Sequence, residues 1–396
     1  MTTQPSAFEV FLAFLRLGLT SFGGPIAHIA YFRAEFVQRR RWLDDAAFTD
    51  LVALCQLLPG PTSSQVGLAL GLRRAGWGGA IAAWVGFTAP SALVLIAFGY
   101  GLHALDGAAG SGLLHGLKVV AVAIVAQAVW GMARSLCPDL PRAAIAAGAA
   151  LLTLALPATG GQLAAIAAAA LLGAWWCRTV PPAACAPAEH LVSRRTGLFA
   201  LALLAALLLG LPLAAALSGS AALQLIDGVF RAGVLVFGGG HVVLPLLESA
   251  VVPQGFVAPG EFLAGYGATQ AVPGPLFTFA AYLGTVASGP LHGWLGGAVL
   301  LVAVFAPGFL LLVGALPFWD AVRRHGTMRS VVAGVNAGVV GVLAAALYDP
   351  VWITAIGSLA DVALALLAFV LLLSGRVSPV FVVGLGALAG WLMAGA

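Results

Sequence analysis

The sequence predicts an all-α, polytopic membrane protein built from two inverted-topology repeats, with about nine spanning helices and four re-entrant helical hairpins. Three observations predict this fold class. Hydrophobic residues make up 61% of the 396 residues and charged residues 8%, whereas globular domains carry roughly a quarter charged residues. Glycine and proline interrupt several long apolar runs. These breaks occur in the same order in both halves of the chain.

The apolar runs are the candidate membrane segments. A helix needs roughly 20 apolar residues to span a bilayer, and thirteen full spans are the alternative to nine spans with four hairpins. The runs lie at about residues 8–32, 48–70, 78–102, 113–135, 142–157, 161–177, 197–217, 222–247, 261–287, 292–316, 328–348, 351–373 and 378–395.

A polar spacer rich in proline, from about Arg178 to Arg195, divides the chain. We expect an N-terminal repeat over residues 1–178, a linker with a connecting transmembrane helix over 179–221, and a C-terminal inverted repeat over 222–396. Internal repeats of this size are typical of membrane proteins whose binding site lies between the repeats.

Two broken segments carry the repeat. The first reads RLGLTSFGGP over residues 16–25 and recurs as RAGVLVFGGG over 231–240; the second reads QLLPGP over 56–61 and recurs as QAVPGP over 270–275. A break frees backbone N–H and C=O groups, which hydrocarbon cannot satisfy, so such backbone occurs where protein or a watered cavity covers it. The breaks therefore mark a site. Two further pairs extend the repeat: Ala89-Pro90 with Ala306-Pro307, and Gly116 with Gly334.

Arginine placement predicts the orientation. Basic loops tend to be cytoplasmic, and Arg40 and Arg73 flank the second run on both sides. That run therefore enters the membrane, breaks and returns. Equivalent loops of the second half carry the opposite charge bias, so we expect Gly255 outside and Arg324 inside, as an inverted repeat requires.

The net charge of +4 reflects loop arginines rather than a nucleic-acid surface. No basic residue lies within Met1–Glu9, so we expect the first segment to be retained. The four cysteines form neither a CxxC pair nor a metal-ligand cluster. We expect reduced thiols and no metal or cofactor. The cysteines are Cys55, Cys137, Cys177 and Cys185.

Hydroxyl side chains open the half-helix after the second break. Thr62, Ser63, Ser64 and Gln65 follow Pro61, and a helix N-terminus offers free N–H groups and partial positive charge to an anion. A capping cluster is the alternative. We favour the anion because buried polar groups at membrane depth tend to be functional.

Two arginines lie inside apolar runs, at equivalent positions. Arg231 has Asp227 four residues earlier, on the same helical face, so it is either a ligand or half of an ion pair. Arg16 has only Glu9, two turns away, and is the better candidate for holding an oxyanion with its forked donors. Lys118 adds a charge to the pathway or extends to the headgroups.

The remaining candidates lie in the breaks. Gln56 and Gln270 either donate to an anion or satisfy freed carbonyls, and the second half offers only Thr278 where the first has three hydroxyls. His28 and His241 either couple transport to protons or pack with hydrogen bonds, and we favour packing. The other candidate binding residues are Thr20, Ser21, Gly23, Gly24, Gly60, Gly238, Gly239 and Gly274.

Taken in order, the motifs over 16–25 and 56–61, with the arginine-rich stretch into Trp42-Leu43 between them, resemble the chromate ion transporter family in its long, two-domain form. The resemblance implies a secondary transporter that exports chromate across a bacterial inner membrane, with sulfate as competitor or exchange ion. A homodimer in the lipid bilayer is the candidate assembly.

Three function classes compete. The first is the oxyanion carrier, for chromate, sulfate or another oxyanion. The second is a channel-like pore, because hairpins that meet from opposite sides also build channels. The third, an intramembrane enzyme, is disfavoured because the sequence contains no Walker loop, no HExxH and no GxSxG motif.

Overall fold

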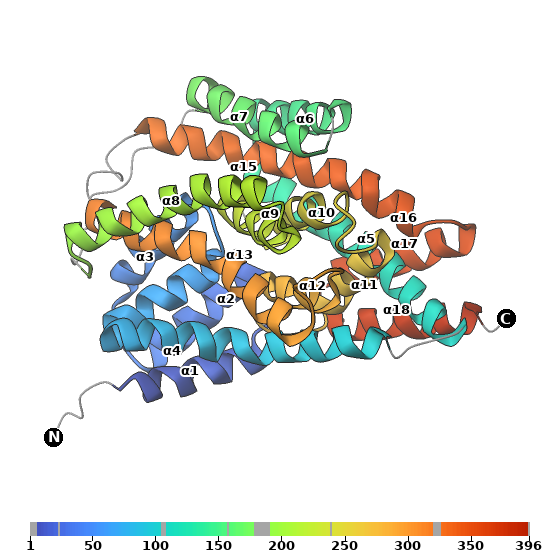
Figure 1. The fold of residues 1–396 in the computed structure, drawn as a ribbon, viewed down its shortest axis with the longest axis horizontal. Helices are drawn as coiled ribbons and strands as arrows, with labels where there is room; N and C mark the ends of the chain where they lie inside the picture. Colours follow the sequence, from blue (N-terminus) through green and yellow to red (C-terminus); the bar gives the residue numbers. More distant parts are fainter. Residues whose placement is uncertain are drawn as a thin grey trace.

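The computed structural model describes residues 6–22, 24–103, 108–156, 158–177, 191–237, 240–319 and 326–394, which are helical and contain no strand. The first half comprises α1 (Ala7–Thr20), α2 (Gly24–Phe32), η1 (Arg33–Arg39), α3 (Asp45–Leu57), α4 (Thr62–His103), α5 (Ala108–Leu136), α6 (Leu140–Ala155) and α7 (Ala158–Trp176). The connector is α8 (Arg194–Ser218). Figure 1 shows the long helices running side by side.

The second half repeats this order. It comprises α9 (Ala221–Leu235), η2 (Gly240–Val242), α10 (Val243–Val251), α11 (Pro259–Thr269), η3 (Leu276–Thr278), α12 (Phe279–Val286), α13 (Gly293–Ala315), η4 (Leu316–Phe318), α15 (Gly326–Ala346), η5 (Leu347–Trp352), α16 (Ile353–Ala355), α17 (Leu359–Leu373) and α18 (Pro379–Ala394). The predicted fold class, all-α and membrane-embedded with two repeats, is confirmed.

Side-chain caps begin several of the helices. Ser6 accepts from Glu9 N before α1, Asp44 from Ala47 N before α3, and Ser193 from Thr196 N before α8. Each satisfies one of the four N–H groups that a helix start leaves unpaired. The short polar stretches between apolar runs therefore fix where the helices begin.

Each of the four predicted broken runs consists of two short helices. The first break separates α1 from α2, and α1 has 14 residues, about 21 Å at 1.5 Å per residue and so shorter than a bilayer core of about 30 Å. The second break separates α3 from the start of α4, and the chain leaves helical geometry again at Ala75 (φ −144°) and Gly76 (φ 60°), where two helices meet at a sharp turn. A Cβ on Gly71 would lie 2.8 Å from Ala83 Cβ, so the chain folds back at this turn. The second part of α4 is therefore the separate third run that the sequence predicts.

An ion cluster gathers three segment ends at one end of the molecule. Glu9, in the first turn of α1, lies 3.6 Å from Arg40 and 3.5 Å from Arg74, and both guanidinium groups stack on the Trp42 ring. Arg40 follows the first hairpin and Arg74 precedes the kink of α4. Both hairpins therefore return to the end at which α1 begins.

The linker between these hairpins carries a second ion pair. The Arg33 guanidinium donates to both Asp45 carboxylate oxygens, at 2.6 and 2.9 Å. This hydrogen bonding holds the pKa of the Asp45 carboxyl below its usual value. The pair is exposed, so it contributes little to stability.

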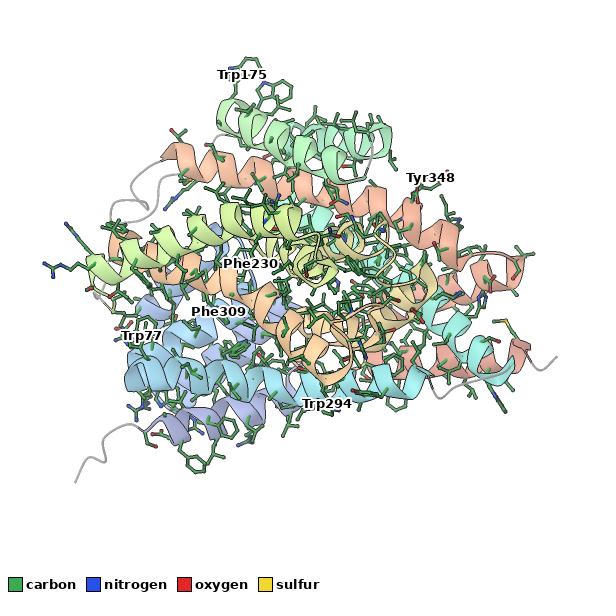
Figure 2. All side chains as sticks on the ribbon, viewed as in Figure 1. Trp77, Trp175, Phe230, Trp294, Phe309 and Tyr348 are labelled. Atoms are coloured by element: carbon green, nitrogen blue, oxygen red, sulfur yellow. The ribbon has the colours of Figure 1, made fainter. Side chains whose placement is uncertain are left out.

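Five helices within the described residues are long and apolar enough to cross a membrane. They lie within Thr62–Leu102, after its turn at Ala75 and Gly76, and within Ser111–Leu136, Arg194–Ser218, Gly293–Phe318 and Thr327–Ala355. Four shorter apolar helices, α6, α7, α17 and α18, supply the remaining candidates among the nine predicted spans. Large aromatic side chains such as Trp175, Trp294 and Tyr348 stand exposed on the outer surface, whereas Phe230 is buried (Figure 2).

The two halves exchange their last helices. The helices α6 and α7 pack on α15, and α17 and α18 pack on α5, as the layers of Figure 1 show. Glycines permit these close crossings: a Cβ on Gly116 of α5 would lie 3.1 Å from Gly390 Cα, and one on Gly334 of α15 would clash with Gly173 Cα. Such small-residue contacts are typical of helix packing in membranes.

Candidate functional site

The tips of the second and fourth hairpins each bond to the opposite half. Gly60 N donates to Val236 O at 2.7 Å, and Gly274 N donates to Ser21 O at 2.9 Å. Gly60 and Gly274 are repeat equivalents, and Ser21 and Val236 follow the ends of the equivalent helices α1 and α9. The second break of each half therefore meets the first break of the other half.

The same tips pack against the long helices of the opposite half. A Cβ on Gly60 would lie 2.9 Å from Gly308 Cα in α13, and one on Gly274 would lie 2.8 Å from Ser91 Oγ in α4. Both glycines have positive φ, 124° and 105°, which other residues rarely adopt. Gly308 and Ser91 each follow a helix-interior proline, at the equivalent Ala-Pro pairs.

A set of buried polar side chains, which we call the polar cluster, surrounds the first-half break. It consists of Ser21 after α1, His28 on α2, Ser63 and Ser64 at the start of α4, and Thr88 further along α4. Each is at most 3% exposed. Buried polar groups normally find hydrogen-bond partners, so this concentration at membrane depth requires an explanation.

Contacts around Phe87 hold the cluster together. His28 Nδ1 lies 3.3 Å from Ser63 Oγ, and the His28 ring meets the Phe87 ring edge-on at 5.1 Å. Thr88 follows Phe87 in α4. The carbonyl of Ser21 accepts the N–H of Gly274, and a Cβ added to Gly274 would lie 3.3 Å from Phe87 O. One hairpin tip and three helices of the first half therefore converge here.

Four polar atoms of the cluster have no partner among the described residues. They are Ser21 Oγ, His28 Nε2, Ser64 Oγ and Thr88 Oγ1. An unsatisfied buried polar group costs about 1–3 kcal/mol. A hydroxyl and a protonated ring nitrogen are donors, so a bound oxyanion is an occupant that would satisfy them.

Helix polarity favours the same occupant. The start of α4 is at Thr62, and the first N–H to bond within it is that of Gln65, to Pro61 O at 2.9 Å. The N–H groups before it carry the partial positive charge of a helix N-terminus. The start of α2, at Gly24, adds a second N-terminus at the other break of this half.

The glutamines of the motifs have different surroundings. Gln65 Nε2 donates to Pro59 O at 3.0 Å and to Gly308 O at 2.9 Å, so Gln65 ties the first-half tip to α13. Gln270 has a buried Nε2 without a partner among the described residues, whereas its equivalent, Gln56, is exposed. Of the three motif glutamines, only Gln270 therefore offers a buried N–H donor without a partner among the described residues.

The second-half site is largely apolar. Thr278 is buried, but its hydroxyl already donates to Pro275 O at 2.8 Å. Phe279, in the position of Gln65, is buried and stacks on Tyr282. His241 lies 2.8 Å from Tyr266 Oη through Nδ1. The structure thus concentrates unpartnered polar atoms in the first half.

The two membrane arginines lie away from the polar cluster. Gly18 packs against the backbone of α4, since a Cβ added to Gly18 would lie 2.8 Å from Gly86 O. Arg16, two residues earlier, is therefore on the opposite face of α1, and it is exposed. The structure gives Arg16 no ion pair within the described residues. Arg231 Nε instead contacts Asp227 Oδ1 at 2.8 Å.

Other candidate residues complete the picture. Lys118 lies inside α5, with Nζ 3.8 Å from the Cβ position of Gly260 at the start of α11. Thr20 Oγ1 donates to Arg16 O at 2.8 Å. Gly23, Gly238 and Gly239 lie outside the described residues.

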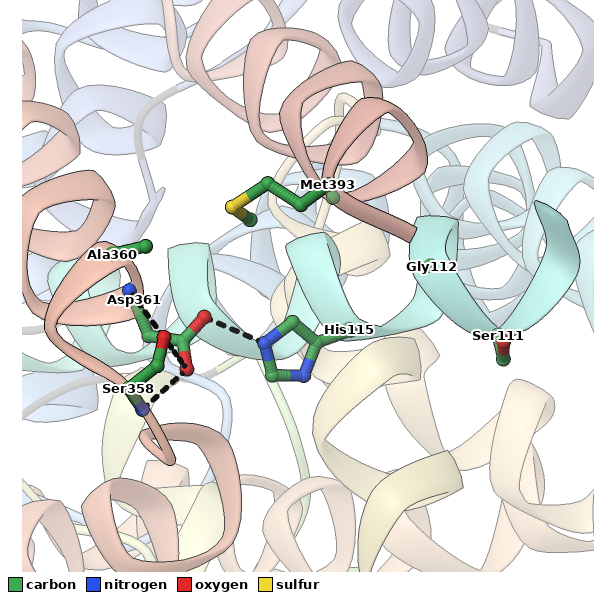
Figure 3. Close-up of a pocket in the computed structure, with 8 residues that line it drawn as sticks. Ser111, Gly112, His115, Ser358, Ala360, Asp361 and Met393 are labelled. Carbon is green, nitrogen blue, oxygen red and sulfur yellow. Dashed lines mark hydrogen bonds and ion pairs between the residues drawn. The ribbon is translucent and has the colours of Figure 1, made fainter. Parts of the chain in front are cut away.

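A separate cavity of about 540 Å³ lies between α5 and the α17–α18 pair. His115 Nε2 is 2.6 Å from Asp361 Oδ1 there, and Asp361 Oδ2 accepts from Ser358 N and Ser358 Oγ (Figure 3). Asp361 Oδ2 also accepts from Gly357 N. Oδ1 links α17 to α5 through His115, whereas Oδ2 caps the start of α17 itself. We interpret the pair as a structural link between the halves.

Sequence reasoning left two cluster members out of the site. The sequence favours hydrogen-bonded packing for His28, and the structure shows such packing, with Ser63, 35 residues away, as the partner. Thr88 carries no motif of its own. The signal that could have found it is the neighbouring Ala-Pro pair, which recurs in the second half and marks the position where a hairpin tip meets a long helix.

Comparison with known proteins agrees with the repeat. The family profile described as chromate transporter matches residues 8–174 and again 223–391. The chain is 30% identical to a chromate transport protein of Pseudomonas aeruginosa over 97% of this chain and 92% of that protein. It is 26% identical to a chromate transport protein of Cupriavidus metallidurans over 91% of this chain and 86% of that one. No solved structure matches the chain.

Proposed function

The chain belongs to the chromate transporter family, and we propose that it is a secondary transporter that exports chromate across a bacterial inner membrane. Exchange with sulfate, or the proton gradient or membrane potential, supplies the energy. Membership makes it a multi-pass membrane protein whose relatives are transport proteins. The finer assignment rests on the chemistry of the site.

The observation that supports it is the polar cluster beside the start of α4. Chromate is a tetrahedral dianion, which needs several donors and positive electrostatic potential without a competing carboxylate. Ser21, Ser64 and Thr88 supply hydroxyls without partners among the described residues. The N-terminus of α4 supplies N–H groups and partial charge. Sulfate has the same shape and charge, so it competes for the same donors.

Hairpin tips from both halves close this site. Gly274, at the tip of the fourth hairpin, bonds to the backbone of Ser21, and it reaches the cluster from the opposite half. An anion held there is separated from one side of the membrane by this tip. Movement of the tip away from Ser21 would open the site to that side, as alternating access requires.

Transport into proteoliposomes tests the proposal. Vesicles that contain the purified protein and internal sulfate should take up labelled chromate in a saturable manner, and external sulfate should compete. Uptake that never saturates, with a conductance to match, would instead indicate a channel-like pore. A saturable carrier that moves sulfate and excludes chromate would indicate a different physiological oxyanion.

Substitutions in the cluster test the site. Ser64→Ala should lower chromate affinity about tenfold or more, because a lost hydrogen bond to a charged group costs about 1.5–3 kcal/mol. Thr153→Ala is the matched control, since the Thr153 hydroxyl only bonds to Ala149 O within α6. Equal affinities in both variants would remove Ser64 from the site.

A further inference from the structure

A second cavity, of about 740 Å³, lies between α7, α8, α9 and α10, outside the polar cluster. We propose that it is an outer vestibule that binds the hydrated oxyanion through Arg231; this rests on the proposed transport function. Its volume is within the range of roughly 300–1,000 Å³ for ligand pockets. It equals the liquid volume of roughly 25 water molecules, so an oxyanion fits with its hydration shell.

Arg231 is the cationic group of this cavity. Its side chain is 46% exposed, that of Asp227 only 16%. Guanidinium carries five N–H donors, and within the described residues only Nε has a partner, Asp227 Oδ1 at 2.8 Å. The remaining donors are available to two oxygens of one anion.

The rest of the lining is mostly apolar, and a few amide and hydroxyl groups interrupt it. They come from three helices and one loop, and the residues are Gln162, Gln224, Ser249 and Gln254. Gln162 Nε2 is held by Pro245 O at 3.1 Å. Pro212, inside α8, leaves the carbonyl of Leu208 without a helical donor, and both residues line the cavity. Polar groups of this kind support a watered site rather than a dry one.

The pairing of Arg231 with Asp227 makes the affinity modest. These two are the only charged residues among those that line the cavity, so its fixed charge is close to zero and the carboxylate competes with an anion for the guanidinium. A pathway benefits from this arrangement, because a site on the route must bind strongly enough to capture the ion and weakly enough to release it.

The cavity also connects the expected outer surface to the hairpin tips. Gln224, near the start of α9, and Gln254, after α10, are at the end that the charge distribution assigns to the outside. Val234 and Leu235 line the inner part of the cavity. The next residue, Val236, accepts the Gly60 N–H through its carbonyl. An anion at Arg231 is therefore one step from the point where the breaks meet.

The connector helix creates this cavity on one side only. The wall formed by α8 covers α9, which holds Arg231. On the equivalent helix α1, Leu12, Arg16 and Leu19 are exposed, and no described helix occupies the place of α8. The repeat therefore carries an arginine at both positions, whereas the vestibule exists only around the second.

Thiol accessibility tests the vestibule. In a protein whose four cysteines are replaced, Gln224→Cys should react with a membrane-impermeant thiol reagent added outside. Sulfate is the probe, since chromate oxidises thiols. At ten times its dissociation constant, sulfate should slow the reaction about tenfold. Sodium gluconate at equal ionic strength controls for screening.

Two further variants isolate the role of Arg231. The pair Asp227→Asn with Arg231→Gln removes both charges together, and here the thiol should still react but sulfate should no longer protect it. Ser218→Cys, at the exposed end of α8 and outside the cavity, should react without protection in the parent protein. Protection that persists in the charge-free pair, or that appears at Ser218→Cys, would overturn the proposal.

Remaining outcomes also decide the matter. Absence of protection at Gln224→Cys in vesicles that still transport chromate would overturn the vestibule while leaving the proposed function intact, and a lipid in the cavity would give this result. Reaction of Gln224→Cys with a reagent added on the inner side alone would place the cavity at the inner surface and would also overturn the proposal of an outer vestibule. Failure of the unsubstituted protein to transport chromate would instead count against the proposed function itself.

Discussion

Gly60→Ala is the sharpest test of the crossed hairpin tips. The backbone φ of 124° lies in a region that alanine rarely adopts, and such strain costs about 1–3 kcal/mol. The new Cβ would lie 2.9 Å from Gly308 Cα and 2.9 Å from Gln65 Nε2, and overpacking of this kind costs about 1–3 kcal/mol. The total is about 2–6 kcal/mol of lost stability.

Thermal unfolding of the purified protein in detergent measures this loss. An unfolding entropy of about 2.1 cal/mol/K per residue, over 396 residues, converts each kcal/mol into about 1.2 °C. The apparent Tm of Gly60→Ala should therefore fall by about 2–7 °C. Chromate transport should fall with it, because the tip can no longer rest on α13.

Two variants calibrate the result. Gly148→Ala, on α6, meets no neighbour within 4 Å and should leave Tm unchanged or raise it, since alanine favours helix. The Tm of Gly274→Ala should lie between those of Gly60→Ala and Gly148→Ala. The nearest neighbour of the new Cβ at position 274 is the Ser91 hydroxyl, which can rotate away, whereas at position 60 it is the backbone Cα of Gly308. If Gly60→Ala unfolds at the temperature of Gly148→Ala, the tip contact described here is not present in the protein.

Three further predictions concern the arginines. Arg16 is exposed on the face of α1 opposite to the helix contact with α4, so Arg16→Gln should leave chromate affinity unchanged; a loss of about 10- to 100-fold, which corresponds to a lost contact of about 1.5–3 kcal/mol, would instead place the guanidinium on the anion. Arg231→Ala should reduce the yield of folded protein by leaving Asp227 unpaired, and Asp227→Asn with Arg231→Gln should restore it; an equally low yield from the double variant would refute this explanation. Single cysteines at Arg40 and Arg73 should be labelled from the same, cytoplasmic, side; labelling from opposite sides would exclude the re-entrant second hairpin.

Much of the fold follows from the sequence because broken helices leave strong local signals. Glycine and proline at the breaks, together with basic residues on both sides of the second run, predicted the hairpins. The ion cluster of Glu9, Arg40 and Arg74 brings the corresponding chain ends together. The pairing of Arg231 with Asp227 was also foreseeable, since residues four apart lie on one helical face.

Contacts between the halves left no comparable signal. The exchange of α6 and α7 for α17 and α18 depends on glycine and alanine surfaces, which a membrane sequence offers on many helices. Gly116 and Gly334 were recognised as repeat equivalents, but nothing local shows that one meets α18 and the other α7. The partner of His28 was missed for the same reason, because Ser63 reaches it through the fold.

The exchange of helices limits how this protein can move. Rocking one rigid half against the other, a common route to alternating access, would shear both exchanged interfaces, α6 and α7 on α15 and α17 and α18 on α5. Each interface is closely packed at glycines, and packed interfaces do not deform continuously. The crossed tips are held instead by a few hydrogen bonds: Gly60 to Val236 and Gln65 to Gly308 at one tip, and Gly274 to Ser21 at the other. Breaking those at one tip exposes one side of the site and leaves the exchanged helices in place, so the hairpins are the elements best suited to gate the anion.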